Sequence, residues 1–170
     1  MQKERWYYKK QKRNSPVSQK GDASLKKSET VLVFVTGQRD CDRLIKTGKK
    51  IADELSLPLK VICIQPVSAG FETDCEELEY LRQTARDAEA EMTVYFYDDA
   101  PLMGASAAKK FGAVHIVTGM AEAPVNGFVE IIHRLLPHVP ISMVAKDGKI
   151  HNICPRRKDE QTAKSISAQN

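Results

Sequence analysis

A chain of 170 residues, 42% of them hydrophobic and 28% charged, has the size and composition of one soluble globular domain. Its net charge of +4 is uneven: residues 1–30 carry nine Lys/Arg against three Asp/Glu, residues 31–145 eleven against sixteen, and residues 146–170 six against three. No run reaches the roughly 18 apolar residues of a membrane span. The four cysteines show neither a CxxC motif nor the spacing of metal ligands. This argues against a disulfide framework and favours reduced thiols in a cytoplasmic protein.

The basic charge lies mainly in two predicted tails. Residues 1–29 are rich in Lys, Ser and Gln and lack the apolar side chains that would offset the entropy of ordering, so this segment is predicted to be mostly disordered. The polar stretch 147–170 is predicted to behave in the same way, which leaves residues 30–146 as the folded domain. Such tails can contact anionic surfaces, but we favour a solubilising role and do not expect nucleic-acid binding.

Within the domain, short apolar runs alternate with amphipathic segments. The first run, VLVFV (31–35), is continuous and β-branched, which is typical of a strand buried on both faces. Asp40 is predicted as the N-cap of the first helix, Asp98 or Asp99 as that of the third, and Gly112 as the residue that ends the third helix. The full set of predicted elements is strands at 31–35, 59–64, 92–97, 114–119 and 141–145 and helices at 40–56, 75–90, 98–112 and 125–138.

This alternation predicts an α/β fold, a single doubly wound five-stranded parallel sheet sandwiched by four helices, of the Rossmann-like kind. Such sheets bind ligands beyond the carboxyl ends of their strands, where the strand order reverses. The loops TGQRD (36–40) and TGMAEAPVNGF (118–128) follow the first and fourth predicted strands. The candidate ligand-binding residues from these two loops are Thr36, Gly37, Gln38, Gly119, Asn126, Gly127 and Phe128.

Other chemistry-bearing residues receive structural interpretations. Cys41 follows the first loop and could be a redox-sensitive thiol near a helix N-terminus, but a packing role is favoured. None of the four histidines shares a local motif with Ser, Cys or a carboxylate, so no catalytic residue is predicted. Asp98 and Asp99 have no evident partners for a metal, and no metal site is predicted.

The last predicted strand, Ile141 to Ala145, is apolar and is expected to be a sheet edge. Such edges are usually covered or paired, so we predict a homodimer formed through this strand.

The segments VHIVTG (114–119) and GFVEIIHRLLPHVPISMV (127–144) resemble the universal stress protein family across residues 31–145. The resemblance implies an adenine nucleotide alpha hydrolase-like fold, dimerisation through the last strand and an ATP site. VLVFVTGQRDCDRLIKTGKKIADEL (31–55) and DDAPLMGASAAKKFGAVHIVTG (98–119) are closer to the stress-protein-like cytoplasmic domain of potassium-sensing histidine kinases. This second resemblance implies a role in stress response or in signalling to a potassium-transport protein.

The family's nucleotide pattern runs glycine, two residues, glycine, nine residues, glycine, and Ser or Thr, and this chain departs from it. Gly119 and Gly127 are separated by seven residues instead of twelve, Glu122 replaces the second glycine, Phe128 replaces the hydroxyl, and Thr36 replaces an acidic residue. Each lost charge-assisted hydrogen bond is worth about 1.5–3 kcal/mol, so losing two or three of them, with the repulsion from Glu122, weakens binding at least about a thousandfold.

The sequence therefore favours a non-catalytic regulatory or binding domain with a degenerate nucleotide loop. Binding of ATP or another adenine nucleotide is disfavoured. The alternative is an ATP-binding, slowly hydrolysing member of the same family.

Overall fold

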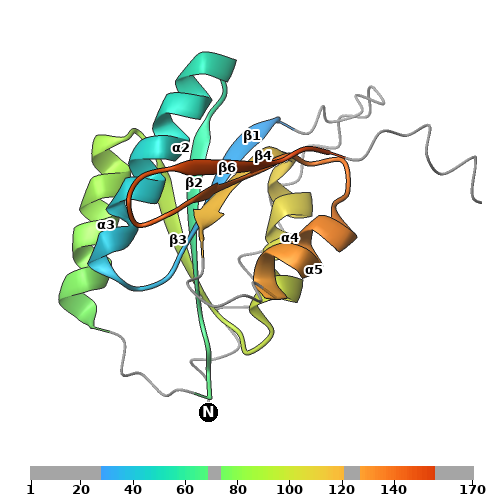
Figure 1. Cartoon of the computed structure of the whole chain (residues 1–170). Coiled ribbons are helices and arrows are strands. Elements are labelled where there is room, and N and C mark those ends of the chain that lie inside the picture. Colours follow the sequence, from blue (N-terminus) through green and yellow to red (C-terminus); the bar gives the residue numbers. More distant parts are fainter. Residues whose placement is uncertain (1–27, 69–73, 121–126, 156–170) are drawn as a thin grey trace, which may run out of the picture.

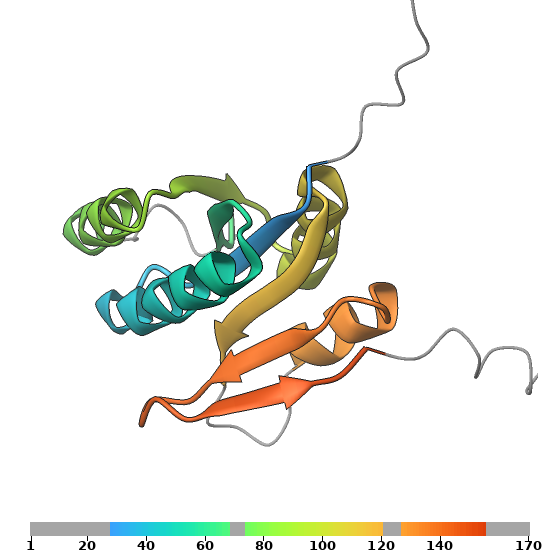
Figure 2. The same ribbon diagram turned by 90° about the horizontal axis from the view of Figure 1, so that it is seen from above.

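A computed structural model describes residues 28–68, 74–120 and 127–155. These residues form a six-stranded sheet in the order β3-β2-β1-β4-β5-β6, with helices α2 and α3 on one face and α4 and α5 on the other (Figure 1 and Figure 2). The strands are β1 (Thr30–Val35), β2 (Leu59–Gln65), β3 (Glu91–Phe96), β4 (Ala113–Gly119), β5 (Ile141–Val144) and β6 (Ile150–Ile153). The helices are a short 3-10 turn, η1 (Arg39–Cys41), followed by α2 (Asp42–Leu55), α3 (Cys75–Asp87), α4 (Ala100–Phe111) and α5 (Gly127–Leu135). Within the described ranges, no helix combines the length and the apolar character that crossing a bilayer requires.

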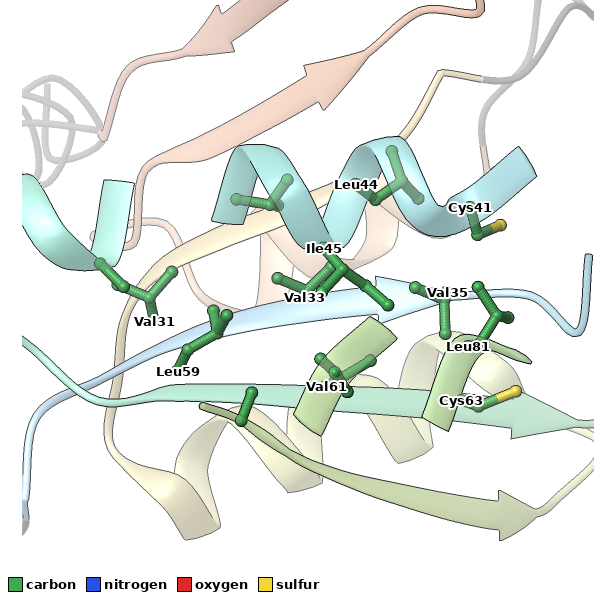
Figure 3. Packing of buried hydrophobic residues seen from close by; sticks show 14 of the residues in the cluster. Val31, Val33, Val35, Cys41, Leu44, Ile45, Leu59, Val61, Cys63 and Leu81 are labelled. Atoms are coloured by element: carbon green, nitrogen blue, oxygen red, sulfur yellow. The ribbon is translucent and has the colours of Figure 1, made fainter. Parts of the chain in front are cut away.

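Strand β1 forms the centre of the sheet, as its uninterrupted apolar sequence predicts. All six of its residues are buried, and it pairs in parallel with β2 on one side and β4 on the other. Val31, Val33 and Val35 pack with residues of α2 and β2 on one face (Figure 3). Leu32 and Phe34 pack under α4 and α5 on the opposite face. The predicted doubly wound α/β fold is therefore confirmed.

The helix boundaries follow from capping groups. Asp99 is the N-cap of α4, because its carboxylate accepts a hydrogen bond from the Leu102 N–H at 3.0 Å, and Gly112 ends that helix with a φ of 64°. The cap was predicted at Asp98 or Asp99, and Gly112 was predicted as the residue that ends the helix. The prediction for Asp40 was wrong, since this residue lies in η1 and α2 begins at Asp42. The Asp40 carboxylate instead accepts a hydrogen bond from Arg43 at 3.0 Å.

The sheet has a sixth strand that the sequence analysis missed. β6 pairs antiparallel with β5, in the register Ile141 with Ile153 and Val144 with Ile150. The turn between them places Gly148 at a φ of +84°, a conformation that favours glycine. β6 lies beyond Lys146, where the sequence analysis ended the folded domain.

This strand overturns the premise of the predicted dimer. Ile141 to Val144 is paired with β4 on one side and with β6 on the other, so it is an inner strand and not an edge. The Ser142 hydroxyl reinforces the second pairing, since it donates a hydrogen bond to Oδ1 of Asn152 at 2.7 Å.

Candidate functional site

The candidate site is a cavity that opens where the strand order reverses. The chain passes from β1 outward to β2 and β3 and then returns to β4 on the other side of β1, so the segments after β1 and β4 diverge. A cavity of about 540 Å³ lies at the carboxyl ends of these two strands. This volume is in the range of small-molecule sites, and the position is the usual one in open α/β sheets. The lining residues come from both loops, both helix layers and the end of β5: Phe34, Val35, Thr36, Gln38, Asp40, Cys41, Arg43, Leu44, Ile64, Ala100, Thr118, Gly119, Met120, Phe128 and Lys146.

Four of the seven candidate residues contribute to this cavity. Thr36, Gln38, Gly119 and Phe128 line it. Gly37 is partly buried between two of them but is not among the lining residues. Gly127 begins α5, is also not among the lining residues, and a Cβ added to it would meet no described atom within 4 Å. Asn126 lies outside the described residues.

The wall on the α4–α5 side is aromatic. Phe128 meets Phe34 edge to face, with ring centroids 5.4 Å apart and an interplanar angle of 69°. Gly104 of α4 makes room for this ring, because a Cβ at that position would lie 3.1 Å from Cζ of Phe128. Phe128 therefore supplies an apolar surface at the position where the resembling family carries a hydroxyl, and such a surface suits a planar ring better than a phosphate.

The opposite wall carries the cavity's charge. Arg43 donates from Nε to the carbonyl of Ala145 at 3.2 Å and from Nη1 to both the carbonyl and the carboxylate of Asp40. Its other terminal nitrogen, Nη2, lies 3.8 Å from the place that a Cβ on Gly119 would occupy. Lys146, which follows β5, is the second cation of the lining. Sequence reasoning missed both cations, because α2 carries several basic residues and only the fold places Arg43 on this wall.

The thiols near the cavity are packing groups. Cys41 is 5% exposed, belongs to the core cluster beneath α2 (Figure 3), and its sulfur lies 3.2 Å from the Thr36 hydroxyl. Cys63 of β2 is fully buried, and burial raises the pKa of its thiol. Its sulfur accepts a hydrogen bond from Gln65 at 3.1 Å. The packing interpretation of Cys41 is confirmed.

The remaining polar constellations hold elements together. Asp98 accepts a hydrogen bond from the Ser68 N–H at 2.8 Å, and this bond lowers the pKa of the carboxyl. His115 of β4 lies 2.9 Å from the Ser142 hydroxyl, whose proton is directed to Asn152, and burial lowers the pKa of His115. Ser142 is 2% exposed, so its hydroxyl has no access to a substrate. Among the described residues, no three His, Cys, Asp or Glu side chains converge in a way that could hold a metal ion.

The comparisons with known proteins agree with this fold. No protein-family model matches the sequence, and no curated protein is significantly similar to it. Solved structures do match. A universal stress protein in complex with cAMP is 15% identical, with a TM-score of 0.54 over 71% of this chain and 99% of that chain. The chain has the fold of the universal stress proteins. A universal stress protein from Archaeoglobus fulgidus DSM 4304 is 18% identical, with a TM-score of 0.51 over 76% of this chain and 45% of that chain. At these identities the similarity establishes the fold alone.

Proposed function

We propose that this chain is a non-catalytic regulatory domain that binds a small adenine nucleotide with a single phosphate in the cavity at the ends of β1 and β4. The observation that carries the proposal is the two-sided lining of that cavity. One wall is aromatic, built on Phe34 and Phe128, and the other carries Arg43 and Lys146. A nucleotide has the same division, with an apolar base at one end and an anionic group at the other.

The proposal disfavours ATP for reasons of sequence. The loop between Gly119 and Gly127 is five residues shorter than the family pattern, and Glu122, which lies outside the described residues, stands in the sequence where that pattern has its second glycine. ATP binding with slow hydrolysis is the alternative function. The complex of a structural neighbour with cAMP supports testing cyclic as well as linear monophosphates.

Isothermal titration calorimetry tests the proposal with AMP, cAMP, adenosine, ATP–Mg²⁺ and a cyclic dinucleotide as titrants. We expect AMP or cAMP to bind more tightly than ATP–Mg²⁺. Gly119→Val should weaken that binding by placing a side chain in the cavity beside Arg43, whereas Ser106→Val on the exposed side of α4 should leave it unchanged. Micromolar binding of ATP–Mg²⁺ in preference to the monophosphates would establish the alternative, and no binding of any nucleotide would refute both.

The regulatory role is proposed from the resemblance to the potassium-sensing kinases. Ligand occupancy would then be read by a signalling or potassium-transport protein. A gene for such a protein next to the gene for this chain would support the assignment, and binding of that protein should change in the Gly119→Val variant, which narrows the cavity.

Self-association is proposed at the outer edge of β6, because β5 is already paired on both sides. Ile150 on β6 is 49% exposed, and an exposed apolar side chain on a sheet edge favours pairing with a second copy. Light scattering should show a dimer that Ile150→Lys dissociates and that Phe96→Lys, on the opposite edge strand β3, does not. A wild-type chain that is monomeric at micromolar concentration would refute the dimer.

A further inference from the structure

We infer that Arg43 forms a phosphate subsite at the side of the cavity next to Gly119 and binds the single phosphate of the ligand. This inference rests on the proposed function, which it deepens by assigning the charged end of the ligand to one residue. The ligand class is a monophosphate ester, linear or cyclic.

The guanidinium of Arg43 is held in a fixed orientation. Nε donates to the Ala145 carbonyl at 3.2 Å, and Nη1 donates to Asp40 through both its main-chain oxygen and its carboxylate, the latter at 3.0 Å. These bonds tie the start of α2 to the end of β5. An arginine held in this way loses little conformational entropy when it binds a ligand, because its planar fork is already oriented.

The Nη2 nitrogen of the Arg43 guanidinium faces the cavity. Arginine has five N–H donors, and within residues 28–68, 74–120 and 127–155 the two N–H groups of Nη2 donate to no acceptor. Nη2 lies on the Gly119 side, and the Arg43 side chain is 21% exposed, so these donors are partly withdrawn from water. Hydrogen bonds from a partly desolvated guanidinium to a phosphate oxygen are stronger than those made at an open surface.

The space beside Nη2 is not required by packing. Gly119 has no positive φ, and a Cβ added there would lie 3.6 Å from Leu44 and 3.8 Å from Nη2, which are ordinary contacts. An alanine would therefore fit at this position. A ligand atom could occupy the open volume next to the guanidinium without displacing a core side chain.

The charges of the lining favour an anion. Among the described residues of the lining, Arg43 and Lys146 are cations and Asp40 is the only carboxylate, so these three formal charges sum to +1. Asp40 is 49% exposed, which screens its charge from the ligand, and its carboxylate points to Nη1 and not to Nη2. Asp40 thus acts as a positioning residue for Arg43.

The test compares AMP with adenosine, which lacks the phosphate, by calorimetry on the full chain. Arg43→Met should weaken AMP binding by about 10-fold to 100-fold, the loss of one charge-assisted hydrogen bond, and leave adenosine binding unchanged. Arg43→Lys keeps the charge without the fork and should give an intermediate loss. The matched control is Arg39→Met, because Arg39 stacks on Tyr80 at 4.5 Å and does not line the cavity.

The outcomes separate this inference from the proposed function. If wild-type protein prefers AMP to adenosine and Arg43→Met keeps that preference, the subsite is refuted and the proposed function stands. If neither compound binds, the proposed function fails, and pyrophosphate is titrated instead. If wild-type protein binds pyrophosphate and Arg43→Met does not, the subsite stands. If Arg43→Met still binds pyrophosphate, or if wild-type protein does not bind it, the subsite is refuted. Should Arg43→Met fail to fold, two other measurements decide whether the subsite exists. One is AMP binding by Arg43→Lys, and the other is whether salt weakens the binding of AMP more than the binding of adenosine.

Discussion

Gly48 of α2 packs directly against Val33 of β1, so closely that a Cβ on Gly48 would lie 2.2 Å from Cγ2 of the valine. Both residues are buried, and Val33 is fully enclosed by the core beneath α2 (Figure 3). The missing side chain sets the distance between the helix and the central strand. It therefore also sets the position of Arg43, one and a half turns earlier on the same helix, relative to the cavity.

Gly48→Ala should destabilise the protein. Inserting a methyl group into a packed core costs about 1–3 kcal/mol, and the better helix propensity of alanine offsets up to about 1 kcal/mol of this. Urea unfolding followed by circular dichroism should show the loss. Lys50→Ala, at an exposed position of α2, is the control and should change the free energy of unfolding little. Unchanged stability in Gly48→Ala would mean that α2 can move away from β1 at no cost.

The adjacent carboxylates Asp98 and Asp99 should give different results when each is replaced by alanine. Asp99 caps α4 through the Leu102 N–H, so Asp99→Ala should lower the free energy of unfolding by about 1 kcal/mol, the usual cost of losing an N-cap. Asp98 instead accepts from the Ser68 N–H. Asp98→Ala should mainly speed the exchange of that amide with solvent in hydrogen-exchange NMR, and equal effects of the two variants on stability would contradict the assignment.

Gly148 should be needed for the β5–β6 hairpin. Its φ of +84° lies in the region that side chains disfavour, so Gly148→Ala should cost about 1–2 kcal/mol. Hydrogen exchange at the amides of β5 and β6 should accelerate in this variant. Gly127→Ala is the matched control, because a Cβ there meets no atom within 4 Å and its φ is not positive. Equal protection of the hairpin in both variants would refute the role of Gly148.

His115 should make stability depend on pH. Burial lowers its pKa below the ordinary value of 6.5, so the folded state binds the proton less readily than the unfolded state does. Its contribution is fully present above pH 6.5 and is lost as the pH falls from there through the folded-state pKa. Urea unfolding at pH 7.5 and pH 5.5 measures this loss of stability. His115→Gln should reduce the loss. His151→Gln, at an exposed position of β6, is the control and should not reduce it. A pH dependence that is the same in all three proteins would exclude His115 as its source.

The sequence predicts the sheet well where each residue carries a strong local signal. VLVFV forms a strand buried on both faces because five consecutive apolar, mostly β-branched residues cannot leave either face to water. Gly112 and Asp99 act at their own helix ends, so local chemistry is sufficient to place them. A cavity lies where the sequence predicts a ligand site, since the alternation of strands and helices determines where the strand order reverses, and the ligand-binding role of the candidate residues stays a prediction.

The missed features depend on distant partners. β6 has only four residues, two of them polar and three of them exposed, and it is held in the sheet by pairing with β5. The dipeptide Asp147-Gly148, between the apolar run 141–145 and the short segment 150–153, was a usable hairpin signal. Arg43 could not be identified in this way, because the carbonyl that orients it belongs to a residue 102 positions away in the sequence.

The pairing of β6 with β5 also has a consequence for synthesis. β6 follows all the other elements of the sheet in the chain, so it leaves the ribosome after them. Until it does, the apolar strand Ile141–Val144 has an open edge that can pair with another nascent chain. The final hairpin therefore determines when newly made protein becomes resistant to aggregation, and conditions that slow its formation should lower the yield of soluble chain before they affect the finished fold.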